Sequence, residues 1–300
     1  MTQAWLKQRE RSNDYALRFL VWMSLSLGRP AGRMVLYPVC LYFLLFSVKA
    51  RRASRKYLGR VLERPPRFGE LFRHYYSFAT VALDRMFLLR NRFAQFDVRV
   101  HGREILDEAT ARGEPCFLLG AHFGSFEALH VYGMEHNLNV TMMMFERGSR
   151  NMNALAKAIN PDLDRSVIGM GSFDSMFKVQ ERFERGEWVG MLGDRRIHDS
   201  GAVGVPFLGA TAALPTAPFR IAALIGRPVV LMVALYLGGN RYDLHFERLV
   251  DVPKLERGKR DAMIRDYATR YVQRLEHYCR LAPYNWFNFY DFWADADAQT

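Results

Sequence analysis

The sequence predicts an α/β fold: a mixed, mainly parallel sheet flanked by helices, with an N-terminal helical arm. Beyond residue 60, short apolar runs of strand length alternate with helix-like stretches, as strands and crossover helices of one sheet do. Before that point the chain combines clustered basic residues with two long apolar stretches. We therefore divide the chain into an arm over residues 1–60 and a globular domain over residues 61–300.

The arm carries almost all of the net charge. Residues 1–60 hold twelve Lys and Arg against two acidic residues, which gives +10 of the total +11. Its apolar stretches, Phe19–Leu27 and Met34–Val48, are shorter than the roughly 20 residues needed to span a bilayer. We expect a membrane-dipping hairpin or interfacial helices, because flanking Lys and Arg mark the cytoplasmic side and attract anionic lipid. A buried core helix with a solvated basic flank is the alternative.

The predicted elements of the globular domain follow the hydrophobic pattern. A break at Arg64–Arg67 precedes an aromatic-rich helix over Phe68–Leu89. Short apolar or alternating runs predict strands over Phe96–His101, Pro115–Leu119, Asn139–Met144, Glu187–Leu192, Pro228–Leu237 and Arg241–Glu247. The last two are joined by Gly-Gly-Asn, which favours a hairpin turn. Helices are expected over Phe126–His136, Met152–Ile159, Phe173–Arg185, Ala213–Ile225 and Gly258–Arg280.

Two further segments are apolar without a clear period. Val205–Gly209 indicates a packed, turn-rich loop, with a wall for an apolar ligand as the alternative. Tyr284–Trp293 is unusually aromatic, which indicates either a packed tail or a membrane-interface contact.

Composition excludes several kinds of site. The three cysteines, Cys40, Cys116 and Cys279, are far apart and show neither metal-ligand spacing nor a disulfide framework. Zinc-protease, paired-cysteine and P-loop motifs are absent from the sequence. Because the basic charge is confined to the arm, the globular domain does not have the charge of a nucleic-acid binder. We predict no metal, no bound cofactor and no nucleic-acid partner.

His122 and Glu127 form the most informative motif, a histidine followed by an acid five positions later. They follow the strand-like run Pro115–Leu119, at a strand-to-helix junction where functional groups of open α/β sheets collect. A neutral imidazole can take a proton from a hydroxyl while a carboxylate orients the ring. We predict His122 as the base and Glu127 as its partner. Backbone N–H groups near Gly124, or a nearby arginine, are the expected oxyanion donors.

The same spacing recurs at His130 and Glu135, so spacing alone does not select the pair. Eight histidines give about one chance match of this kind. His130 lies inside a helix-like stretch, which is typical of a partly buried helix histidine. Context therefore favours His122, for which packing or capping near a helix start is the alternative.

Charged residues beyond other predicted strands favour an anionic substrate. Asp194 and Arg195 follow one apolar run, and Arg147 and then Arg165 follow another. Guanidinium groups bind phosphate or carboxylate through a planar fork. A surface ion pair with Asp199 is the alternative for the Asp-Arg-Arg segment.

Six segments occur in order over roughly residues 95–293: GAHFGSFE, FERGSRN, Gly-Asp-Arg after an apolar strand, VPFLG, GRPVV and the ending WFNFYDFW. This set resembles the bacterial lipid A biosynthesis (late) acyltransferases of the lysophospholipid acyltransferase superfamily. The resemblance implies that His122 and Glu127 are catalytic. It also implies roles for Arg147, Asp194 and, by a looser match, Arg165, which we assign with Arg195 to substrate binding. The Pro-Glu-Gly motif of glycerophosphate acyltransferases is absent, and Gly-Asp-Arg stands in its place.

The resemblance implies an acyltransferase domain over residues 61–300, at the cytoplasmic face of a bacterial inner membrane. The expected reaction moves a fatty acyl group from an acyl carrier protein or CoA thioester to a hydroxyl of a lipid or glycolipid acceptor resembling lipid A. An acyltransferase of an aryl-polyene or other lipid-conjugate pathway stays open. Asp162–Asp164 and the arginines leave a membrane glycosyltransferase open, and the arm leaves a non-enzymatic binding module open.

Overall fold

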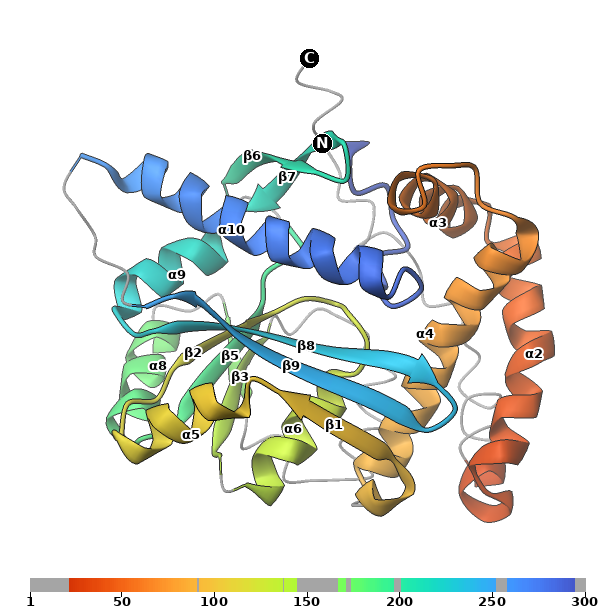
Figure 1. Cartoon of the computed structure of the whole chain (residues 1–300), viewed down its shortest axis with the longest axis horizontal. Coiled ribbons are helices and arrows are strands. Elements are labelled where there is room, and N and C mark those ends of the chain that lie inside the picture. Colours follow the sequence, from red (N-terminus) through yellow and green to blue (C-terminus); the bar gives the residue numbers. More distant parts are fainter. Residues whose placement is uncertain are drawn as a thin grey trace.

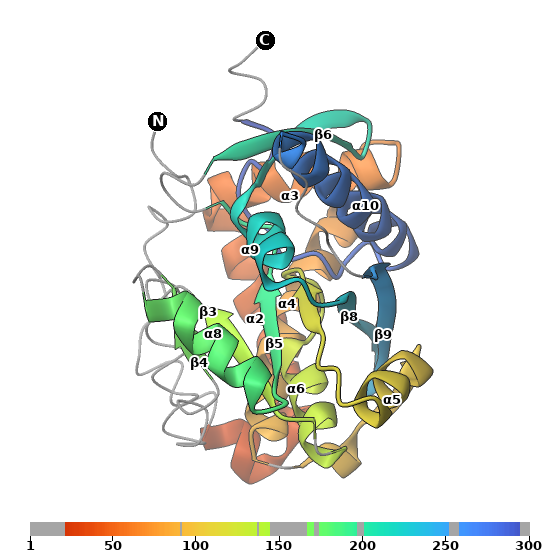
Figure 2. The same cartoon turned by 90° about the vertical axis from the view of Figure 1, so that its left-hand side faces the viewer.

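The chain folds around one central sheet covered by helices on both faces (Figure 1). The computed structural model describes residues 22–90, 92–136, 138–144, 167–170, 174–196, 201–251 and 258–294. Helices α9 (Ala217–Ile225) and α10 (Arg260–Leu281) cover one face, and α5 (Arg103–Ala111) and α6 (Phe126–Glu135) cover the other. Figure 2 shows the same layers from the side.

Seven strands form the sheet in the order β1-β9-β8-β2-β5-β3-β4. Their bounds are β1 (Asp97–His101), β2 (Phe117–Gly120), β3 (Val140–Met144), β4 (Val167–Gly169), β5 (Trp188–Leu192), β8 (Val229–Gly238) and β9 (Arg241–Val250). All neighbouring pairs are parallel except β8 with β9, which form the predicted hairpin. The predicted mixed, mainly parallel α/β class is confirmed.

Most predicted helices form with shifts of a few residues at their ends. Helix α4 (Phe68–Leu88) begins after two prolines, where Glu70 accepts a hydrogen bond from the backbone N–H of Arg67 at 2.7 Å. This hydrogen bond from the backbone to the Glu70 side chain stabilises the first turn of α4. Helix α8 (Asp174–Glu184) and helices α6 and α10 match their expected segments. The expected helix Met152–Ile159 lies outside the described residues.

The segment from 202 to 225 differs from the prediction. Strands β6 (Ala202–Phe207) and β7 (Ala210–Pro215) form a separate antiparallel pair, so the loop expected at Val205–Gly209 and the helix start expected at Ala213 are both wrong. Alternate side chains of β6 are buried, a period of two that the short apolar run concealed. The structure also contains α5 and β4, which the sequence pattern did not predict.

Helices α2 (Arg29–Phe46) and α3 (Val48–Val61) of the arm pack onto the rest of the chain. Helix α2 lies against α4, and α3 follows it (Figure 1). Leu36, Cys40 and Leu44, spaced four apart, are buried in the common core. Among the described residues no single helix is long and apolar enough to cross a membrane, although α2 and α3 together, bent by 94°, pass that test.

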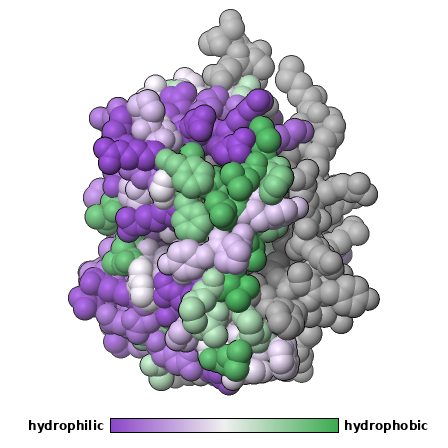
Figure 3. Space-filling model, turned by 90° about the vertical axis from the view of Figure 1, so that its right-hand side faces the viewer, coloured by the Kyte–Doolittle hydropathy of each residue, from purple (hydrophilic) through white to green (hydrophobic). Residues whose placement is uncertain are grey.

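The other side of α2 is exposed and also apolar. We call this side the α2 outer face; it consists of Met34, Tyr37, Leu41, Tyr42, Leu45 and Phe46, which are 41–68% exposed. Figure 3 shows apolar side chains gathered on this side of the molecule. An exposed apolar strip of this kind marks an interaction surface more often than an ordinary solvated one.

Candidate active site

His122 lies just beyond the carboxyl end of β2, in the short connection to α6. Ligand and catalytic groups of open α/β sheets collect at this edge, because the loops there converge from neighbouring strands. Ser125 caps the helix, since its Oγ accepts a hydrogen bond from the N–H of Ala128 at 3.2 Å. The predicted location of His122 at a strand-to-helix junction is confirmed.

Gly124 makes the tight turn after His122 possible. Its φ of 57° lies in the left-handed region, and a Cβ at this position would lie 1.5 Å from the carbonyl oxygen of Ala234 on β8. Only glycine avoids that clash. The turn therefore brings the chain beside β8 and holds His122 at the edge of the sheet.

Asp194, which follows β5, holds the imidazole of His122. The Nδ1 atom of His122 lies 2.7 Å from Oδ1 of Asp194, and the backbone N–H of His122 donates to Oδ2 of the same carboxylate at 3.0 Å. Because the carboxylate accepts from Nδ1–H, Nε2 is left with the lone pair that a general base requires. The His122 side chain is 29% exposed, whereas that of Asp194 is fully buried.

The C-terminal aromatic segment completes the support of this pair. Trp286 Nε1 and Asn288 Nδ2 donate to Oδ2 of Asp194 at 3.1 Å and 2.8 Å, and the N–H of Phe287 donates to the carbonyl oxygen of His122 at 2.8 Å. Trp286 and Trp293 are buried. The packed-tail interpretation of Tyr284–Trp293 is confirmed, and this tail fixes the orientation of the carboxylate.

The environment keeps His122 neutral and Asp194 ionised. Burial lowers the pKa of His122, and the positive charge of Arg195 lowers it further, against the opposing effect of Asp194. Burial alone would raise the pKa of Asp194, but His122, Arg195 and the hydrogen bond from Asn288 hold it well below its usual range. A neutral imidazole oriented by a carboxylate is equipped to accept a proton.

Arg195 is directed into the protein. Its Nε donates to Oδ1 of Asn288 at 2.8 Å and its Nη2 to the carbonyl oxygen of Phe287 at 2.9 Å. Arg195 therefore braces the segment that supports Asp194, while its predicted contact with substrate stays a prediction.

Glu127 does not orient the ring of His122. It lies in the first turn of α6, where its Oε1 is 2.7 Å from Nε of Arg85 on α4. The predicted partnership between Glu127 and His122 is thus corrected: Asp194, assigned from sequence to substrate binding, occupies that place. A carboxylate five residues after His122 is carried onto the helix, whereas the end of the neighbouring strand β5 lies beside the ring.

The backbone donors expected near Gly124 are already used. The N–H of Phe123 donates to Ala121, that of Gly124 to Asn285 and that of Ser125 to Ala234, at 2.7–3.1 Å. These three amides therefore cannot also stabilise an oxyanion without breaking the turn, whereas the other expected donor, a nearby arginine, stays a prediction.

Several sequence candidates fall outside the described residues. Arg147, Arg165, Asp162, Asp164 and Asp199 belong to this set, and so their predicted roles stay predictions. His130 and Glu135 lie in helix α6, but their side chains are likewise outside the description. Arg85, Trp286 and Asn288 were not predicted, because nothing in the linear sequence links them to His122.

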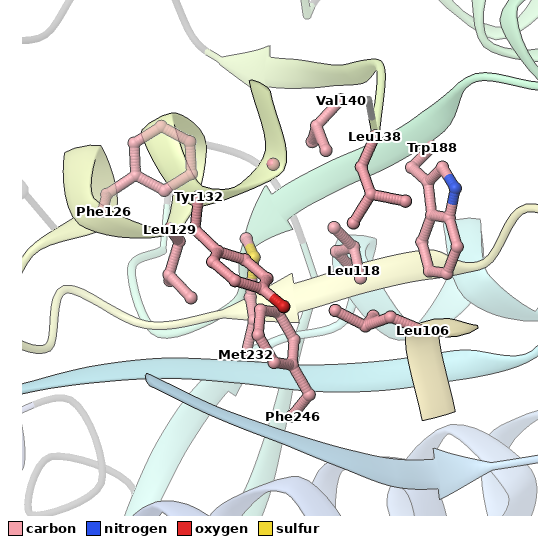
Figure 4. A pocket seen from close by; sticks show the side chains of 11 residues that line it. Leu106, Leu118, Phe126, Leu129, Tyr132, Leu138, Val140, Trp188, Met232 and Phe246 are labelled. Atoms are coloured by element: carbon pink, nitrogen blue, oxygen red, sulfur yellow. The ribbon is translucent and has the colours of Figure 1, made fainter. Parts of the chain in front are cut away.

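An apolar pocket lies between α6 and the sheet, beginning at the first residue of α6 (Figure 4). It encloses about 20 Å³, roughly the room for one water molecule. A longer apolar ligand would therefore enter only if side chains moved. Its lining is almost wholly apolar: Leu106, Leu118, Phe126, Leu129, Tyr132, Gly133, Leu138, Val140, Trp188, Met232 and Phe246.

A separate cluster of His101, Asp243 and His245 lies on β1 and β9, with potential ligand atoms within 4.8 Å of one another. Arg241 already donates two hydrogen bonds to the carboxylate of Asp243, at 2.9 Å and 3.0 Å. The two imidazole rings stack, with centroids 4.4 Å apart and planes inclined by 11°, so their nitrogen lone pairs lie in two separate, nearly parallel planes. Converging these ligands on one ion would require the groups to rearrange.

Comparison with known proteins identifies the family. The family model for bacterial lipid A biosynthesis acyltransferases matches residues 75–294, which includes the whole His122–Asp194 site. Among solved structures, the 1-acyl-sn-glycerophosphate (LPA) acyltransferase PlsC from Thermotoga maritima is similar, with 16% identity, 83% of this chain and 98% of that chain covered, and a TM-score of 0.39. No curated protein matches the sequence significantly. The family match disfavours the glycosyltransferase and non-enzymatic alternatives, and the chain belongs to the bacterial lipid A biosynthesis acyltransferase family as an acyltransferase that uses an acyl donor and a lipid acceptor.

Proposed function

We propose that the protein transfers a fatty acyl group from an acyl carrier protein thioester to a hydroxyl of a lipid A precursor, at the cytoplasmic face of the bacterial inner membrane. The observation that carries this proposal is the His122–Asp194 pair. It presents an oriented, neutral imidazole at the sheet edge, within the segment matched by the family model. An acyl-CoA donor and a different amphiphilic acceptor are the competing versions of the same reaction.

In the proposed mechanism Nε2 of His122 removes the proton from the acceptor hydroxyl as its oxygen attacks the thioester carbonyl. The carbonyl π electrons move onto oxygen, giving a tetrahedral intermediate. When the intermediate collapses, the carbon–sulfur bond breaks and the thiolate takes the proton from the imidazolium. Asp194 stabilises the imidazolium between these steps.

The apolar pocket beside α6 is our candidate site for the acyl chain. It begins at Phe126, four residues after His122, and its lining offers almost no polar group to a hydrocarbon chain. Filling it requires movement of the lining side chains, because the enclosed space is small in this structure.

Donor and acceptor are tested directly. Purified protein is given dodecanoyl-acyl carrier protein or dodecanoyl-CoA, together with a lipid A precursor, and the products are followed by mass spectrometry. We expect an added acyl mass on the lipid, formed faster with the carrier-protein donor. A faster CoA reaction would reassign the donor, and transfer only to other lipids of the cell would reassign the acceptor.

Membrane association is expected to depend on the α2 outer face. Removing residues 1–60 would also expose the core that Leu36, Cys40 and Leu44 help to form, so surface exchanges are the cleaner test. Replacing Leu41, Leu45 and Phe46 with serine should shift the protein from the membrane pellet to the supernatant. Each large apolar side chain contributes up to about 1.5–3 kcal/mol when it leaves water.

The matched control is Phe177→Ser on α8, an apolar side chain that is 75% exposed on another element. It should leave the distribution between pellet and supernatant unchanged. Full retention of the triple α2 variant in the pellet would contradict membrane binding through this face.

The rate of acyl transfer should fall as pH drops through the pKa of His122, because only the neutral ring accepts a proton. Since burial and Arg195 lower that pKa from its ordinary value of 6.5, the acidic limb of the pH–rate profile, where the rate falls, should lie below pH 6.5. Arg195→Gln removes a positive charge, so the pKa should rise and the limb should move to higher pH. Arg196→Gln is the neighbouring control and should leave the limb in place. A pH profile of Arg195→Gln that stays at or below the wild-type position would contradict this electrostatic role.

A further inference from the structure

Arg85 is the feature of the site that the reaction described above leaves unused. Its side chain on α4 is 23% exposed, and its Nε lies 2.7 Å from Oε1 of Glu127. This Nε is buried and the contact lacks hydrogen-bond alignment, so the two groups are held mainly by opposite charge. Neither Nη group donates a hydrogen bond to any residue within the described parts of the chain. Among the described residues, Arg85 therefore has a partner at Nε and no hydrogen-bond partner at its Nη groups.

The fold brings Arg85 to the loop that carries His122. Phe78 lies seven residues before Arg85, two turns away on the same side of α4. The centroid of its ring is 5.3 Å from the ring centroid of Phe287. Phe287 in turn donates its N–H to the carbonyl oxygen of His122. At the other end of this side, Arg85 contacts Glu127, which lies five residues after His122. The same side of α4 therefore flanks the His122–Glu127 segment at both ends.

The proposed reaction places negative charge on the carbonyl oxygen, and that charge needs a donor. The N–H groups of residues 122–125 are all engaged within the protein. Arg195 uses Nε and Nη2 to brace the C-terminal segment. A guanidinium suits the task, because it can hold one partner at Nε while offering parallel N–H groups to another.

We propose that Arg85 is a catalytic residue that donates hydrogen bonds to the thioester carbonyl oxygen as negative charge develops there, and that Glu127 is the residue that positions it. No proton leaves Arg85: its N–H groups stabilise the oxygen until the carbonyl re-forms and the thiolate departs. This inference rests on the proposed function. It also gives Glu127 a role in the reaction that does not require contact with His122.

The test is steady-state kinetics of Arg85→Ala, Arg85→Lys and Glu127→Gln, with dodecanoyl-acyl carrier protein and a lipid A precursor. Loss of one oxyanion donor typically lowers kcat by about 10²–10³-fold. We expect that loss in Arg85→Ala, with KM changed by less than about two-fold because ground-state binding is retained. Arg85→Lys should be intermediate, since the charge stays but the fork is lost.

Two further readouts separate this role from a structural one. Added guanidinium should restore part of kcat in Arg85→Ala, and not in His122→Ala. The double variant Arg85→Ala/Glu127→Gln should be little slower than Arg85→Ala alone, because the pair acts as a unit. Arg90→Gln, an exposed arginine just beyond α4, is the matched control and should behave as wild type.

The possible results are distinct. Wild-type kcat in Arg85→Ala overturns the assignment, and so does a folded Arg85→Ala variant that guanidinium does not rescue. A raised KM with unchanged kcat would instead assign Arg85 to recognition of a phosphate in the donor or acceptor. If Arg85→Ala does not fold, an unimpaired kcat in Arg85→Lys overturns the proposal. Absence of acyl transfer by the wild-type protein would refute the proposed function itself, whereas an inactive His122→Ala beside a fully active Arg85→Ala refutes this inference alone.

Discussion

Replacing His122 with alanine is expected to lower the rate of acyl transfer by about 10²–10⁴-fold, the usual contribution of a general base. The imidazole is 29% exposed and lies at the end of a strand, so its removal leaves little buried volume empty. The variant should therefore fold, as circular dichroism can confirm. The measurement is transfer from dodecanoyl-acyl carrier protein, followed by release of the thiol and by the mass of the lipid product.

His130→Ala is the matched control, because His130 has the same spacing to Glu135 as His122 has to Glu127. His130→Ala should retain a rate close to that of wild type. Full activity in His122→Ala together with an inactive His130→Ala would show that the wrong histidine was chosen. Full activity in both variants would remove the general-base mechanism altogether.

Asp194→Asn is expected to lower the rate of acyl transfer at least as much as His122→Ala does, because it reverses the tautomer of His122. Trp286, Asn288 and the N–H of His122 all donate to Oδ2, so the amide oxygen of asparagine belongs on that side. The amide NH₂ then faces Nδ1, and the ring must carry its proton on Nε2. A base with Nε2 already protonated cannot accept the substrate proton, and an analogous exchange in a serine protease costs roughly 10⁴-fold.

Asparagine is a better test than alanine at this position. Asp194→Ala would leave three buried donors without an acceptor, at about 1–3 kcal/mol each, and loss of folding would obscure the kinetics. Asp84→Asn is a suitable comparison, because Asp84 is also a fully buried carboxylate, paired with Arg29 and Tyr242. It should lower stability in urea unfolding while leaving kcat near wild type. An Asp194→Asn enzyme with wild-type kcat would show that Asp194 does not control the proton on His122.

The local pattern predicted the elements whose burial has a simple period. Apart from β4, the strands of the main sheet are visible in the sequence as apolar or alternating runs, and the Gly-Gly-Asn turn marks the β8–β9 hairpin. The β6–β7 pair was missed because Pro206, Leu208 and Gly209 suggested a loop, while its alternating burial depends on helix α10 packed against β6. Short segments whose burial is set by a distant helix are therefore poorly predicted from local pattern.

The site residues also differ in whether the local sequence identifies them. The sequence alone located His122, because a histidine between an apolar strand and a helix can be recognised from its immediate neighbours. Glu127 followed from spacing, but the structure places it on helix α6 beside Arg85, and Asp194 is the carboxylate that holds Nδ1 of His122. The residues that support His122 are far from it in sequence: Asp194 lies 72 residues later, and Trp286 and Asn288 lie further still.

What the sequence by itself determined is the chemistry available: a histidine at a strand end, carboxylates and arginines beyond neighbouring strands, and a basic, apolar arm. The family resemblance added the class of reaction, which the family match then confirmed. Only the tertiary structure decided which carboxylate orients the histidine. The order of strands in the sheet, with β5 beside β2, brings Asp194 to Nδ1, and strand order depends on long-range pairing that no local spacing encodes.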